Sequence, residues 1–122
     1  MRTRRAAATL AALLMTAGLT TAATGTAQAA GECGGTLFAS ATGNKGKLRL
    51  YKEGANYCAI VYHTDAYWGV YLPTAVQIVR ADGGLSHQDD GNYRYYAGPV
   101  RMVSYGLFAY ASAWVNGEHL VT

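Results

Sequence analysis

The sequence has no apolar run long enough to form a membrane-spanning helix. Its mostly apolar stretch Ala6–Leu19 covers about 14 residues, whereas a helix needs about 20 apolar residues to cross the hydrocarbon core. We therefore expect no stable membrane span.

This short stretch is instead typical of a secretory signal peptide. Three arginines precede it, at positions 2, 4 and 5, and the small-residue sequence Ala27-Gln28-Ala29 follows it. A basic start, an apolar middle and small residues at the cleavage site are the three parts of such a signal. The sequence predicts a removable signal peptide at residues 1–29 and a single secreted β domain at residues 30–122.

The predicted mature chain also lacks an excess of positive charge. The whole chain has ten Lys and Arg and seven Asp and Glu. Removing the three signal-peptide arginines leaves seven cations facing seven anions. A net charge near zero gives no electrostatic argument for a nucleic-acid partner, and none is expected.

Cysteine is scarce, and its scarcity excludes a zinc site built on thiolates. Cys33 and Cys58 are the two cysteines of the chain, and a structural zinc site normally needs four ligands. In an exported protein such a pair predicts a disulfide. Closing a loop of this length adds about 3 kcal/mol to stability in the chain-entropy model. No cofactor is expected.

The residue pattern predicts an all-β fold. Polar and apolar residues alternate in several short segments, and glycine-containing turns separate them. Segment 47–51 and segment 57–64 predict a hairpin, and Asn116-Gly117 predicts a type I′ turn before a last strand at 118–121. Residues 86–92 are expected to form a loop. We expect a small single-domain antiparallel sandwich or barrel of about seven to eight short strands with one disulfide.

Two kinds of chemistry, nucleophilic catalysis and calcium binding, find little support in the sequence. Ser86 or Ser104 with His63 or His87 could suggest a catalytic triad, but neither serine stands in a recognised nucleophile motif. The acidic sequence Asp89-Asp90 offers oxygen ligands for calcium but lacks the alternate spacing of an EF-hand loop. The sequence predicts no catalytic residues and no metal site.

The aromatic residues give two interpretations, and the sequence leaves both open. Ten tyrosines and two tryptophans stand beside only two phenylalanines, and such rings can simply cover a small core. Alternatively, Tyr67, Trp68 and Tyr71 form a binding face. In this interpretation residues 67–71 are extended, so that Tyr67 and Tyr71 share one side and Trp68 points to the other.

Three further motifs carry a resemblance to a known family. Gly83-Gly84, the segment 90–94 (Asp-Gly-Asn-Tyr-Arg) and the segment 95–100 (Tyr-Tyr-Ala-Gly-Pro-Val) resemble the spore-associated protein A family of actinomycetes. The resemblance implies a small exported protein found with aerial spores, and it implies no catalytic residue.

The expected function is therefore that of a non-enzymatic secreted protein on the spore or cell surface. Its expected partner is a spore or cell-wall component, or another secreted protein. The alternative is a secreted inhibitor of a protease or other hydrolase.

Overall fold

The computed structural model describes residues 32–122, and the predicted signal peptide lies outside them. Residues Cys33–Thr122 form one compact unit. Its elements are β1 (Thr36–Thr42), β2 (Gly46–Glu53), β3 (Asn56–His63), the 3₁₀ turn η1 (Asp65–Tyr67), β4 (Leu72–Arg80), β5 (Asp89–Tyr93), β6 (Tyr96–Val103), β7 (Ala109–Val115) and β8 (Glu118–Val121). Within this part of the chain no helix is long and apolar enough to cross a membrane.

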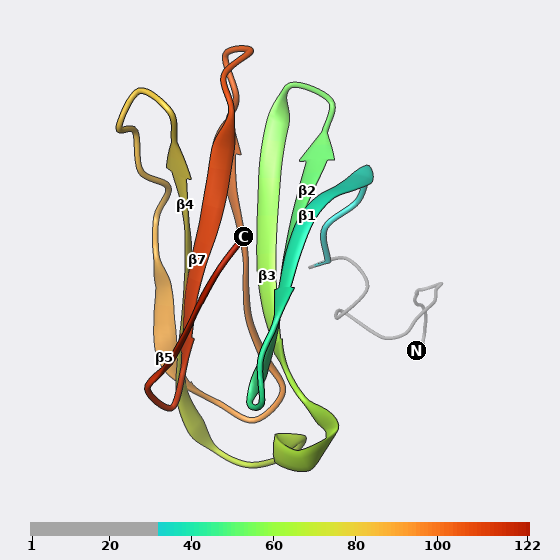
Figure 1. Ribbon diagram of the computed structural model, residues 1–122, viewed down its shortest axis with the longest axis vertical. Coiled ribbons are helices and arrows are strands. Elements are labelled where there is room, and N and C mark those ends of the chain that lie inside the picture. The colour runs from blue at the N-terminus through green and yellow to red at the C-terminus, as the bar shows by residue number, and fades with distance from the viewer. Residues whose placement is uncertain (1–31) are drawn as a thin grey trace, which may run out of the picture. The chain divides into compact units, whose positions relative to one another are not determined.

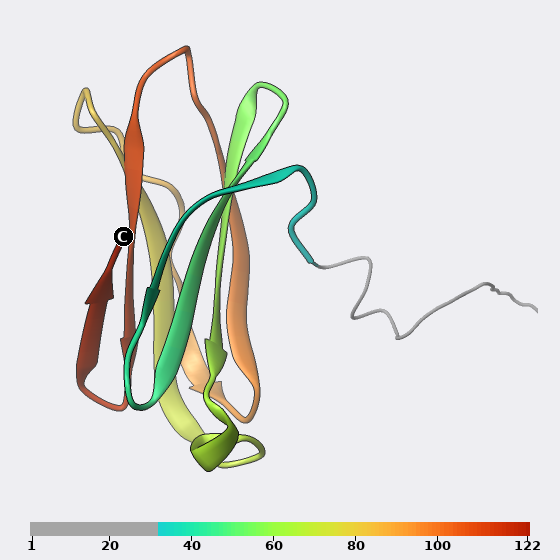
Figure 2. The same ribbon diagram turned by 45° about the vertical axis from the view of Figure 1, so that its right-hand side comes forward.

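The eight strands form two four-stranded antiparallel sheets that face each other. Sheet A has the order β1-β2-β3-β6, and sheet B has the order β5-β4-β7-β8. Figures 1 and 2 show the two layers side by side, with the turns gathered at the two ends. The predicted all-β fold is confirmed, and it is a sandwich with one disulfide.

The core lies between the sheets and follows the alternation of the sequence. Leu48 and Leu50 of β2 face Val76 and Ile78 of β4, all with no exposed surface. Successive side chains of a strand point to opposite faces. The polar neighbours of these residues therefore lie on the outer faces of the sandwich.

The turn at Asn116-Gly117 has the predicted geometry. Both residues have positive φ angles, 46° and 88°, as a type I′ turn requires. The returning strand β8 pairs with β7 beyond this turn. The local sequence was therefore sufficient to place the hairpin.

Only the second part of the expected loop at residues 86–92 differs from the prediction, because Asp89–Tyr93 pairs with β4 as strand β5 while residues 86–88 lie outside any strand. The carboxylate of Asp89 accepts hydrogen bonds from the Tyr93 hydroxyl and from the backbone N–H of Gly98 in the other sheet. Gly98 has a φ of 97°, and a Cβ there would lie 2.9 Å from the carbonyl oxygen of Ala59. This acidic segment and the Gly-Pro motif therefore join the two sheets.

Candidate functional site

The outer face of sheet A combines rings, cations and hydroxyls. Lys47 lies opposite Tyr62 in the pairing of β2 with β3, and Tyr62 lies opposite Tyr96 of β6. On the other side, Thr42 and Ser40 of β1 lie opposite Lys47 and Arg49. Directly opposed side chains on one face are about 4.5–5.5 Å apart at Cβ, so these residues form one continuous surface.

An open groove of about 330 Å³ lies on this surface. We call it the Trp68 groove, and its lining residues are Lys47, Arg49, Tyr62, Asp65 and Trp68. The first three come from β2 and β3, and the other two come from the segment that follows β3. This segment lies at one end of the sandwich (Figures 1 and 2).

The segment after β3 is a tight turn, so the extended conformation expected for residues 67–71 is wrong. The backbone N–H of Tyr67 donates to the carbonyl of Thr64, and that of Val70 donates to the carbonyl of Tyr67. Gly69 allows the reversal with a φ of 85°. Strand alternation therefore does not decide which way the rings point.

The structure gives the three predicted ring residues different surroundings. Trp68 is 52% exposed and lines the groove, with its ring centroid 4.9 Å from that of Tyr95. Tyr71 is 61% exposed and lies 5.2 Å from the guanidinium of Arg94. Tyr67 is half-buried. Of the three, Trp68 is the one that lines the groove.

A buried histidine holds this turn against the sandwich. His63 has no exposed surface, and its Nδ1 lies 3.2 Å from the carbonyl oxygen of Tyr67. Because a carbonyl only accepts hydrogen bonds, Nδ1 carries the proton and donates it. Nε2 lies 2.9 Å from the hydroxyl of Thr74. His63 is therefore a structural residue that positions the segment carrying Trp68.

Sequence reasoning missed four lining residues: Lys47, Arg49, Tyr62 and Asp65. The alternation in β2 and β3 did place the first three on the faces opposite Leu48 and Val61. The missing information was the position of Trp68 relative to these strands. The turn after β3 supplies that position through contacts beyond the local pattern.

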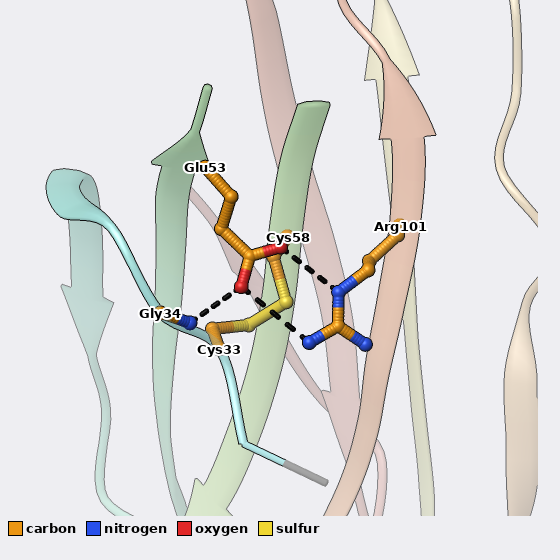
Figure 3. The surroundings of a disulfide bond; sticks show 5 residues. All are labelled: Cys33, Gly34, Glu53, Cys58 and Arg101. Atoms are coloured by element: carbon orange, nitrogen blue, oxygen red, sulfur yellow. Dashed lines mark hydrogen bonds and ion pairs between the residues drawn. A yellow bond between two sulfur atoms is a disulfide. The ribbon is translucent and has the colours of Figure 1, made fainter. Parts of the chain in front are cut away.

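The disulfide lies on the outer face of sheet A, the face that also carries the Trp68 groove. Figure 3 shows its surroundings. Cys33 and Cys58 are bonded, with their Cα atoms 5.7 Å apart, which confirms the predicted pair. Beside them, Glu53 accepts hydrogen bonds from Arg101, at 2.9 Å, and from the backbone N–H of Gly34. The Arg101 hydrogen bond is the main reason that the pKa of Glu53 lies below its ordinary value. This cluster anchors the start of the domain.

The serines considered for catalysis bond to the backbone. The hydroxyl of Ser86 donates to the carbonyl of His87 and accepts from the N–H of Ile78. The hydroxyl of Ser104 accepts from the N–H of Gly106. Neither serine makes a hydrogen bond to a histidine ring within the described part of the chain.

A serine–histidine contact does occur elsewhere, on the outer face of sheet B, and the sequence had not suggested it. Ser112 Oγ lies 2.8 Å from Nε2 of His119, whose ring stacks on Trp114 at 4.5 Å. No carboxylate among residues 32–122 bonds to the His119 ring. A triad needs a third group that orients the histidine, so this pair lacks a described partner for that role.

No group of three or more His, Cys, Asp or Glu side chains among residues 32–122 is arranged to hold a metal ion. Asp89, one of the two acidic residues considered for calcium, instead accepts a hydrogen bond from the Tyr93 hydroxyl. The hydrogen bond to the Asp89 carboxylate, aided by burial, raises the pKa of Tyr93 to about 12. This carboxylate therefore has a structural role.

The fold and groove define a disulfide-linked antiparallel β-sandwich with an aromatic and cationic groove on one outer face. The chain matches no protein-family model, no curated protein and no solved structure.

Proposed function

We propose that the mature protein is a non-enzymatic extracellular protein that attaches to the spore or cell surface through the Trp68 groove. The observation that carries this proposal is the half-exposed Trp68 ring beside Lys47 and Arg49. Exposed aromatic and arginine side chains commonly dominate the energy of a binding surface. The disulfide supports an oxidising, extracellular environment, and the resemblance to the spore-associated family supports the spore.

The lining of the groove supports binding rather than hydrolysis. Glycoside hydrolases generally use two carboxylates that flank the scissile bond. Among the described residues that line the groove, Asp65 is the one carboxylate, and none is a serine, cysteine or histidine. These side chains fit recognition of a ligand and give no acid–base pair.

The experiment is a retention assay on purified spores and on cell walls. We expect wild-type protein to be retained and Trp68→Ala to bind about thirtyfold or more weakly, since a stacking ring of this kind contributes about 2 kcal/mol or more. Trp114→Ala is the matched control, because it removes a tryptophan from the other sheet. Retention of a folded Trp68→Ala protein at the wild-type level would contradict the proposal.

A second function, inhibition of a secreted protease, is favoured by the loop between β6 and β7. Tyr105 and Phe108 are 73% and 76% exposed there. The loop is fixed by a hydrogen bond from the Ser104 N–H to the carbonyl of Ala55 and by another from the Ala81 N–H to the carbonyl of Phe108. A rigid loop with exposed rings suits insertion into a cleft.

This second function ranks below the first because of the loop carbonyls. The carbonyls of Leu107 and Phe108 already accept hydrogen bonds, from the Tyr57 hydroxyl and the Ala81 N–H. A protease that holds a substrate-like loop directs its oxyanion donors at such a carbonyl. Stoichiometric inhibition of any member of a panel of secreted proteases, lost in Phe108→Ala, would reverse this order.

A further inference from the structure

The Trp68 groove holds positive charge that its surroundings do not neutralise. Lys47 and Arg49 form no ion pair with any other residue of the range 32–122. They are two residues apart on one strand, which puts their Cα atoms about 7 Å apart on the same face. Asp65 is the one anion in the lining. The positive and negative charges of the mature chain balance overall, whereas the lining of this groove has more cations than anions.

The other cations on this molecule have partners of their own. Arg101 on the same face pairs with Glu53 at 2.9 Å, and Arg80 pairs with Asp82 at 2.8 Å. Lys52, three residues along β2 from Arg49, donates its Nζ to the carbonyl of Gly54. The contrast indicates that Lys47 and Arg49 are available to an anion from outside the chain.

The rings beside these cations offer flat apolar surfaces. The Trp68 ring rests against Tyr95 at 4.9 Å, and the Tyr62 ring lies 6.0 Å from that of Tyr96. Each groove ring is thereby supported from one neighbour. A supported, half-exposed ring provides contact area at low entropic cost, and the C–H face of a sugar ring packs well on such a surface.

Short polar side chains complete the surface. Ser40 and Thr42 are exposed on β1 opposite the two cations, and Asp65 is an exposed residue of the groove lining. Hydroxyls donate and accept hydrogen bonds, and a carboxylate accepts them. This mixture suits a ligand rich in hydroxyl groups, which can donate hydrogen bonds to Asp65.

We propose that the Trp68 groove binds an acidic saccharide, with a sugar ring on Trp68 and its carboxylate or phosphate held by Arg49 and Lys47. A guanidinium can take such an anion with two parallel hydrogen bonds. The inference rests on the proposed function and names the ligand class of the same site. It requires that the charge of the saccharide, and not its ring alone, decide the affinity.

The test measures binding of full-length mature protein to defined oligosaccharides by calorimetry. The carboxylate probe is a galacturonate hexamer, and its fully methyl-esterified form is the neutral control of the same shape. The phosphate probe is a glucose hexamer phosphorylated at O6. We expect at least one acidic probe to bind about tenfold or more tightly than the neutral hexamer, and the advantage should shrink as salt is raised.

Variants assign the effect to the groove. The double change Lys47→Gln and Arg49→Gln should lower affinity for the acidic probe by about tenfold or more and leave the neutral hexamer unchanged. Trp68→Ala should lower the affinity for the acidic probe and for the neutral hexamer alike. Lys52→Gln is the matched control, because it removes one charge from the same strand outside the groove. Melting temperatures establish that each variant is folded, and Arg49→Lys should keep part of the preference.

Three results would overturn the inference. The first is that neither acidic probe binds, or that neither binds more tightly than the neutral hexamer. The second is an unchanged affinity in the folded double variant. The third is tighter binding of a thymidine oligonucleotide than of either acidic saccharide. Retention on spores that survives the double change but not Trp68→Ala would overturn the acidic ligand and leave the proposed function intact.

Discussion

Glu118 accepts a hydrogen bond from the backbone N–H of Lys45 at 2.7 Å, across 73 residues of sequence. The same carboxylate also accepts the N–H groups of Asn44, at 2.9 Å, and Gly46, at 3.3 Å. The first residue of β8 thus fixes the turn between β1 and β2, at the end of the strand that carries Lys47 and Arg49. The hydrogen bonds from Lys45 and Asn44 hold the pKa of Glu118 below its ordinary value of 4.5.

The lowered pKa predicts how stability depends on pH. A carboxyl group with a lower pKa in the folded state stabilises the fold fully above its unfolded pKa and loses this contribution as the pH falls through the folded value. Glu118→Gln should destabilise the protein by about 1 kcal/mol at neutral pH. It should also reduce the loss of stability that the wild-type protein shows as the pH falls (the acid limb of the stability curve). Urea midpoints between pH 7 and about 3 measure this. Asp90→Asn, an exposed change on β5, is the control, and an acid limb identical to wild type would contradict the prediction.

Tyr93 should lose its proton later than an ordinary tyrosine. The Asp89 carboxylate stabilises the neutral phenol and raises its pKa to about 12 from the ordinary 10.0. The contribution to stability is therefore complete below the unfolded pKa and lost as the pH rises through the folded value. Tyr93→Phe should lower the free energy of unfolding by about 1–3 kcal/mol at neutral pH.

The measurement for Tyr93 is the absorbance of tyrosinate during an alkaline titration. The difference between wild type and Tyr93→Phe should appear near pH 12. Tyr110→Phe removes one exposed phenol from β7 and controls for the loss of a chromophore. A Tyr93 difference centred at the ordinary value would show that the Asp89 contact is absent in solution.

Loss of the disulfide should destabilise the domain. The bridge closes a separation of 25 residues, for which the chain-entropy model gives about 3 kcal/mol. The double variant Cys33→Ser and Cys58→Ser should unfold at a correspondingly lower urea concentration. A reductant should lower the urea midpoint of the wild-type protein by a similar amount. The reductant should leave the double variant unchanged. An identical wild-type midpoint with and without reductant would show that the bridge adds nothing to stability.

Export should remove the first 29 residues. Intact mass spectrometry of protein collected outside the cell should give a chain that starts near Ala30, because the small residues Ala27 and Ala29 precede that position. The mass should be about two units below that of the reduced chain, since oxidation of the pair removes two hydrogens. Collected protein that retains Met1 would refute the assignment of the signal.

The sequence predicted the strands best where a local rule applied. The alternation around Leu48 and Leu50 gave both the strand and its buried face, and the pair Asn116-Gly117 gave the turn. It failed at residues 89–92, where the strand pairs with the distant β4 and the Asp89 carboxylate accepts hydrogen bonds from Tyr93 and from Gly98 in the other sheet. No local pattern of polar and apolar residues encodes that link.

For the candidate site, the residue pattern was enough to show which side chains of β2 and β3 face outward, since the period of a strand is two residues. It also supplied Trp68 and the cysteine pair. Only the tertiary structure placed Trp68 beside Lys47 and Arg49, because that position depends on a turn held by the buried ring of His63 and on the pairing of distant strands. Side-chain direction is a local property of a strand, whereas the meeting of separate segments depends on the packing of the whole domain.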